Sequence, residues 1–92
     1  MFKKNKKNDE ELTAAEAREK TAEAKEEQFR KFVVDAWSHI KLEIESGHTN
    51  ALVWTTNTQE DIVTRAIKHF ENLGYKVTRS DHYISISWGV EK

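Results

Sequence analysis

Apolar residues recur at steps of three and four through the middle of the chain, between Phe29 and Ile44. This spacing places them on one face of an α-helix, and we expect that face to pack on the rest of the fold. The residues of this stripe are Phe29, Phe32, Val33, Ala36, Trp37, Ile40 and Ile44.

The helix that carries the stripe is predicted to run from about Ala14 to Ser46. At its start, Thr13 and Glu16 have the spacing of a capping box, in which each side chain accepts a hydrogen bond from the other residue's backbone N–H. No helix breaker follows until Gly47, which suits the left-handed position just after a helix. The helix is therefore expected to be long, about 50 Å at 1.5 Å per residue.

A second helix is predicted to open within residues 57–61, with Asn57 or Thr58 as its N-cap, and to end at Gly74. Its apolar residues also recur at helical spacing, which predicts one buried face. That face consists of Ile62, Val63, Ala66, Ile67, Phe70 and Leu73.

Three strands are predicted, over residues 51–56, 75–79 and 83–88, because these segments are rich in β-branched and aromatic residues. The last one alternates, with Ile84, Ile86 and Trp88 on one face and Tyr83, Ser85 and Ser87 on the other. Such alternation is typical of a half-buried antiparallel strand.

The element order predicts an α+β fold, a long N-terminal helix followed by β-α-β-β. We expect a two-layer structure in which the third strand lies between the other two and both helices cover one face of the sheet. The other face of the sheet stays open.

Three segments follow from this reading. Residues 1–11 are predicted to be a disordered basic and acidic tail, residues 12–28 a protruding helical arm, and residues 29–92 the compact α+β domain. The arm has only small or polar residues at a 3-4-3-4 spacing, which fits either an oligomer interface or a solvated helix. These residues are Ala14, Ala17, Thr21, Ala24 and Gln28.

The composition favours homo-oligomerisation and argues against nucleic-acid and membrane partners. Hydrophobic residues make up 37% of the 92 residues and charged ones 34%, so the core is small and oligomerisation would add to it. The net charge of −1 gives no general attraction to nucleic acid, and no apolar run reaches the length of a membrane span. We expect a cytoplasmic homo-oligomer without membrane or nucleic-acid partners.

No catalytic, metal or nucleotide motif is present, and there is no Cys. The four histidines, His39, His48, His69 and His82, lack the spacing of metal ligands. We therefore expect a non-enzymatic protein without cofactor or metal.

The open sheet face is the candidate ligand site. We expect the hydroxyl residues Thr55, Thr78, Ser85 and Ser87 there, with Val53, Arg79 and Tyr83 nearby. Hydroxyls and an arginine suit a phosphate-bearing ligand, although such residues are also common on a solvated face. The predicted ligand-binding residues are Arg79, Tyr83, Ser85, Ser87 and Arg65.

A possible basic patch consists of Arg65, Lys68, Lys76 and Arg79. Acidic residues are interspersed with it, so we interpret it as a surface of mixed charge.

Three segments resemble small accessory proteins of unknown function encoded by tailed bacteriophages: LTAAEAREKT at 12–21, ENLGYKV at 71–77 and YISISW at 83–88. The resemblance implies a non-enzymatic protein that acts on a host partner or signal molecule, or a minor virion part. It assigns no functional residues. The expected location is then the cytoplasm of the host cell.

Together these observations lead us to expect an oligomeric binding protein of phage type. Its predicted role is to sequester a host-derived small ligand, such as a nucleotide immune signal. The alternative is a protein–protein interaction module that inhibits a host protein or serves in a virion, with the Ala14–Gln28 face as its contact surface.

Overall fold

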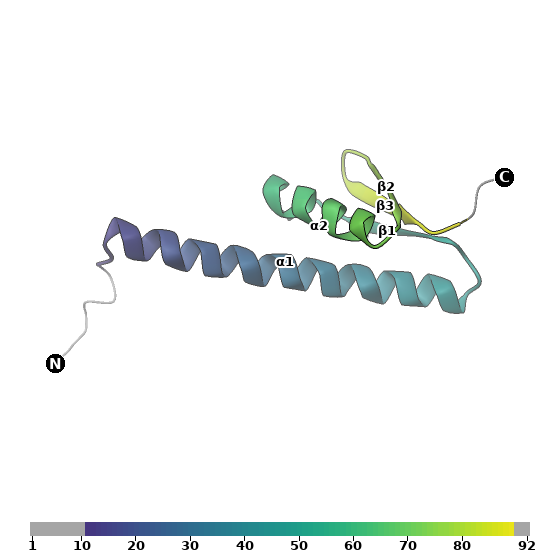
Figure 1. Cartoon of the computed structure of the whole chain (residues 1–92), viewed down its shortest axis with the longest axis horizontal. Helices are drawn as coiled ribbons and strands as arrows, with labels where there is room; N and C mark the ends of the chain where they lie inside the picture. The colour runs from purple at the N-terminus through teal and green to yellow at the C-terminus, as the bar shows by residue number, and fades with distance from the viewer. Residues whose placement is uncertain (1–10, 90–92) are drawn as a thin grey trace.

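The computed structural model describes residues 11–89, which form two helices and a three-stranded antiparallel sheet (Figure 1). The elements in chain order are α1 (Ala14–Glu45), β1 (Asn50–Trp54), α2 (Glu60–Asn72), β2 (Lys76–Arg79) and β3 (Tyr83–Ser87). The predicted α+β fold is therefore confirmed. The predicted tail lies mostly outside the described residues.

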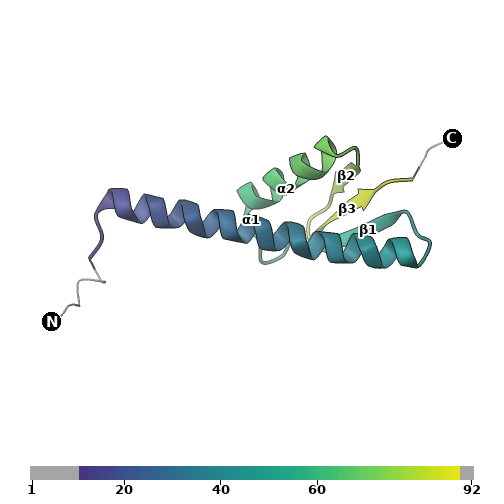
Figure 2. The ribbon, with the colours of Figure 1, turned by 60° about the horizontal axis from the view of Figure 1, so that its bottom comes forward.

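The capping box fixes the start of α1. Thr13 Oγ1 accepts from the Glu16 N–H at 3.1 Å, and Glu16 Oε1 accepts from the Thr13 N–H at 3.0 Å. The helix then continues for 32 residues, and Gly47, with φ of +83°, follows its C-cap. Its N-terminal part extends beyond the start of α2 (Figures 1 and 2).

The three strands are all antiparallel to their neighbours, and β2 and β3 form a hairpin. The sheet order is β1-β3-β2, so the last strand lies in the middle, as predicted. Trp54 faces Tyr83 across the β1–β3 pair, and Arg79 faces Ile84 across the β2–β3 pair. β1 and β2 are therefore the two edge strands.

Both helices pack on one face of this sheet, where Phe32, Ala36 and Ile40 of α1 join buried residues of α2 and of the sheet in one core cluster. An aromatic group of Trp37, Phe70, Tyr75 and Trp88 continues the core at the end of the domain where α2 finishes, with ring centroids 5.3–6.0 Å apart. The buried hydrophobic residues are Phe32, Ala36, Ile40, Ala51, Val53, Ile62, Val63, Ala66, Phe70, Ile84 and Ile86.

Two residues predicted to be buried are exposed. Ile44 has 53% of its surface accessible, because it lies in the last turn of α1, beyond the residues that pack on the sheet. Leu73 has 55% accessible, because α2 ends at Asn72 and Leu73 is already its C-cap. The helical periodicity continues through both positions, whereas the packing ends before them.

Two residues predicted to lie on or near the open face are buried instead. Val53 has none of its surface accessible and Thr55 only 8%. Together with Ala51 they point toward the helices, so the inward and outward residues of this strand are the reverse of those we expected.

The start of α2 also differs from the expectation. The N-cap is Gln59, which makes no capping hydrogen bond through its side chain, and not Asn57 or Thr58. Thr58 instead donates its backbone N–H to the Thr55 carbonyl in the preceding turn. The end is as predicted, since Gly74 adopts a φ of +99°.

Candidate functional site

The open face of the sheet carries the outward side chains of all three strands. Because burial alternates along β1 and β3, the paired outward residues are Trp54 with Tyr83, Leu52 with Ser85, and Asn50 with Ser87. Lys76 and Thr78 complete the face on β2, opposite Ser87 and Ser85. This face has an apolar end and a polar end.

The apolar end is built from Leu52, Trp54 and Tyr83. Trp54 keeps 61% of its surface accessible and Leu52 keeps 43%. The Trp54 and Tyr83 rings meet edge to face, with centroids 5.6 Å apart and planes at 79°. A large aromatic ring held in place yet left exposed is a common feature of binding surfaces.

The polar end has a side-chain hydrogen bond already formed across the strands. Ser85 Oγ donates to Asn50 Oδ1 at 2.6 Å. The amide NH₂ of Asn50 is thereby oriented, because its oxygen is engaged by the serine. This end offers an oriented amide donor and neutral hydroxyls.

The structure separates the residues predicted to bind a ligand. Tyr83, Ser85 and Ser87 share the open face, but Arg79 faces Ile84 in the register and thus belongs to the helix-covered side. Its guanidinium donates to Glu60 Oε1 at 2.7 Å. Arg79 is therefore an ion-pair partner of α2 and does not lie among the hydroxyls.

Arg65 lies between the two helices. Its Nη1 donates to Glu26 Oε1 at 2.9 Å and its Nη2 to Oε2 at 3.4 Å, and its Cζ lies 3.9 Å from the centre of the Phe29 ring. The hydrogen bond from Arg65 lowers the pKa of the Glu26 carboxyl below its ordinary value. These contacts tie α2 to α1, far from the open face.

A second ion pair between the helices lies near the point where α1 first contacts α2. Lys25 Nζ donates to Asp61 Oδ2 at 2.5 Å, which lowers the pKa of the Asp61 carboxyl. Contact with α2 thus includes Lys25 and Glu26, inside the segment that we predicted to protrude. The small-residue stripe, Ala14, Ala17, Thr21, Ala24 and Gln28, is exposed along its whole length.

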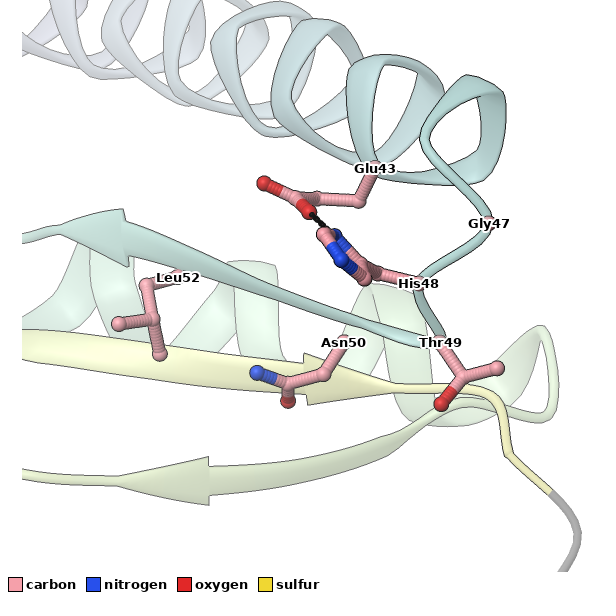
Figure 3. A pocket seen from close by; sticks show the side chains of 6 residues that line it. All are labelled: Glu43, Gly47, His48, Thr49, Asn50 and Leu52. Carbon is pink, nitrogen blue, oxygen red and sulfur yellow. Dashed lines mark hydrogen bonds and ion pairs between the residues drawn. The ribbon is translucent and has the colours of Figure 1, made fainter.

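Two shallow depressions border β1 on the side of α1. One, of about 630 Å³, is lined by Glu43, Gly47, His48, Thr49, Asn50 and Leu52 (Figure 3). In it, His48 Nδ1 and Glu43 Oε1 are 2.6 Å apart. The other, of about 390 Å³, is lined by Gln28, Lys31, Phe32, Asp35, Trp54, Asn57, Thr58 and Gln59.

Neither depression has a metal-binding constellation. Within residues 11–89 no group of three or more His, Asp or Glu side chains is placed to hold a metal ion. His39 lies 3.6 Å from the Asp35 carboxylate, and His69 packs edge to face on Phe29.

No helix among the described residues is long and apolar enough to span a membrane.

Sequence reasoning missed Trp54 and Leu52. Side chains alternate between the two faces of the sheet along ALVW at 51–54, but apolar residues occur on both faces, so the pattern did not show which of them point outward.

Comparison with known proteins gave no match to a protein family, to a curated protein or to a solved structure.

Proposed function

We propose that this protein is a non-enzymatic, phage-type interaction module that binds a host protein through the open face of its sheet. The observation that carries the proposal is the exposed Trp54 ring, held against Tyr83 and next to the exposed Leu52. Aromatic side chains that are preordered on a rigid strand lose little conformational entropy on binding and are enriched at the centres of interfaces. The partner surface should present an apolar patch with hydrogen-bonding groups beside it.

The surrounding residues suit such an interface. Asn50, Thr78, Ser85 and Ser87 provide neutral hydrogen-bonding groups beside the apolar end, and among the outward residues of the three described strands one, Lys76, is charged. This arrangement places polar groups beside an exposed apolar cluster, a combination that protein interfaces share.

A site-specific photo-crosslinking experiment tests the proposal. A benzophenone amino acid is placed at position 54 and, as the control, at position 34, where Val34 is similarly exposed on α1, at 67% against 61% for Trp54. After irradiation in bacterial cells, we expect one discrete adduct from position 54 and none from position 34. Equal labelling from both positions, or no adduct from position 54, would refute the proposal.

Capture of a small ligand on the same face is the second candidate. It is favoured by the position of Trp54, whose exposed ring can stack on a planar base, near the oriented amide of Asn50. The separation of both arginines from this face leaves it without the guanidinium contacts that we expected for a phosphate. Titration with cyclic dinucleotides should then quench tryptophan fluorescence in the native protein and not in Trp54→Phe.

A further inference from the structure

The outer edge of β1 has unpaired backbone groups. Thr55 donates its N–H to the His82 carbonyl, and the Thr49 carbonyl accepts from Trp88, so odd-numbered residues of this strand bond to β3. By the alternation of an antiparallel ladder, the N–H and C=O of Asn50, Leu52 and Trp54 point away from β3. Within residues 11–89, β1 pairs with β3 alone.

The two edges of the sheet differ in charge. β2 is a four-residue strand with Lys76 and Arg79 at its ends, and charged residues on a short edge discourage another strand from pairing there. β1 has five residues, all uncharged, and two of its outward side chains are Leu52 and Trp54. The β1 edge therefore lacks the features that protect the β2 edge.

The two depressions described above lie along this edge, and we refer to the two together as the groove. Each depression beside β1 is lined both by residues of α1, on the covered side of the sheet, and by outward residues of β1, on the open side. The depressions therefore wrap around the free edge, one at each end of the strand. Leu42 lies two helical turns after Asp35, on the same flank of α1, and is 59% exposed. The flank of α1 between the two depressions therefore also exposes an apolar side chain.

We propose that the β1 edge takes up an extended segment of the partner protein as a fourth strand, in the groove between β1 and α1. The inference rests on the proposed function and specifies how the partner is recognised. Backbone groups of Asn50, Leu52 and Trp54 hydrogen-bond to the segment, while its side chains point alternately to the open face and into the groove.

The lining of the groove sets the side chains that the segment should carry. Toward the open face, apolar side chains would cover Leu52 and Trp54. The Lys, Asp and Glu residues of the two depressions are Lys31, Asp35 and Glu43, an excess of one negative charge among them. A segment with alternating apolar residues and a Lys or Arg near Glu43 is the complementary partner.

A second copy of this chain does not fit the same edge by antiparallel pairing of β1 with β1. α1 packs on β1, and a twofold axis perpendicular to the sheet would place both copies of α1 on the same face, separated by about the strand spacing of 4.8 Å. Packed helices need about 8–10 Å between their axes. The occupant is therefore a segment with no helix behind it, such as a tail or a loop.

The test uses a displayed library of short random peptides, selected on the full chain. We expect enriched peptides with alternating apolar residues. N-methylation of the alternate peptide amides that bond to β1 should weaken binding about tenfold or more, and methylation of the intervening amides should have little effect.

Two variants at one position separate backbone from side-chain recognition. Leu52→Pro removes the outward N–H, at an edge position where β3 makes no use of that group, while the control Leu52→Ala retains it. With folding checked by the thermal midpoint, we expect Leu52→Pro to lose at least about tenfold more affinity than Leu52→Ala.

The remaining outcomes overturn the inference in distinguishable ways. Peptide binding that is lost in Trp54→Ala but is insensitive to N-methylation and to Leu52→Pro would refute strand addition and leave the proposed function standing. A dimer abolished by Leu52→Pro would show a second copy on this edge. Failure to enrich any peptide, together with no adduct from position 54, would refute both proposals.

Discussion

Replacement of Ile40 by alanine should destabilise the protein far more than the same replacement at Ile44, one turn later in α1. Ile40 has none of its surface accessible, whereas Ile44 has 53% accessible. The two substitutions remove the same atoms from the same helix. Their difference therefore isolates the effect of packing.

The magnitude follows from the atoms removed. Isoleucine to alanine deletes three carbons, worth about 2.4 kcal/mol at about 0.8 kcal/mol per buried methylene. The cavity left in a close-packed core adds to this, so we expect about 3 kcal/mol for Ile40→Ala, within the range of about 2–5 kcal/mol for such changes. At Ile44 about half of the transfer term applies, and the better helix propensity of alanine offsets a few tenths of it, leaving about 1 kcal/mol or less.

Urea unfolding followed by far-UV circular dichroism measures both values. The expected stability of a chain of 92 residues, about 5–14 kcal/mol, leaves Ile40→Ala folded enough to give a transition. Equal losses at the two positions, or a larger loss at Ile44, would show that the end of α1 is packed and would refute the assignment of the core.

Three further predictions concern a turn, the acid response and the arm. Gly74→Ala should cost about 1 kcal/mol in urea unfolding, because φ is +99° there and a Cβ is disfavoured; an unchanged midpoint would contradict this strain. The pKa values of Glu26 and Asp61 are lowered in the folded state, so their stabilisation is complete above the unfolded-state carboxyl pKa and is lost as pH falls through the folded value. The double variant Glu26→Gln/Asp61→Asn should therefore lose less stability than the native protein between about pH 5 and about pH 2, and parallel curves would contradict the role of these ion pairs. If the exposed small-residue stripe of α1 mediates the homo-oligomerisation that the sequence led us to expect, native mass spectrometry should show a multimer that Ala17→Glu converts to monomer; a multimer retained in that variant would exclude the stripe.

The local elements could be predicted because each depends on neighbouring residues. Thr13 and Glu16 cap α1 within one turn, and Gly47 and Gly74 end the two helices through their own backbone conformation. The central position of β3 follows from a tight hairpin, which allows β3 to pair with β1 as well as β2. The α+β class therefore followed from the order of these elements.

The site was harder to predict because it depends on which alternate residues of a strand point toward the helices. In β1 apolar residues occur on both sides of the strand, and the smaller ones, Ala51 and Val53, face inward into the core cluster that also contains Ala36 of α1. Leu52 and Trp54 are left outside as a result. No local pattern encodes this choice.

The two arginines illustrate the same limit. Arg79 belongs to a four-residue strand, too short for its own alternation to fix its face, and the pairing with β3 places it opposite Ile84. Arg65 meets Glu26, 39 positions away in sequence, and only the packing of α2 on α1 brings the two together. The phosphate site expected from these residues depended on contacts between distant parts of the chain.

The free edge of β1 is the feature on which the proposed recognition depends, and amide hydrogen exchange followed by NMR tests it most directly. In the free protein we expect slow exchange at Ala51 and Val53, whose N–H groups bond to β3, and fast exchange at Leu52 and Trp54. Saturation with a selected peptide should slow exchange at Leu52 and Trp54 and leave Ala51 and Val53 unchanged. Slow exchange at Leu52 and Trp54 without peptide, or fast exchange that persists with peptide bound, would contradict strand addition at this edge.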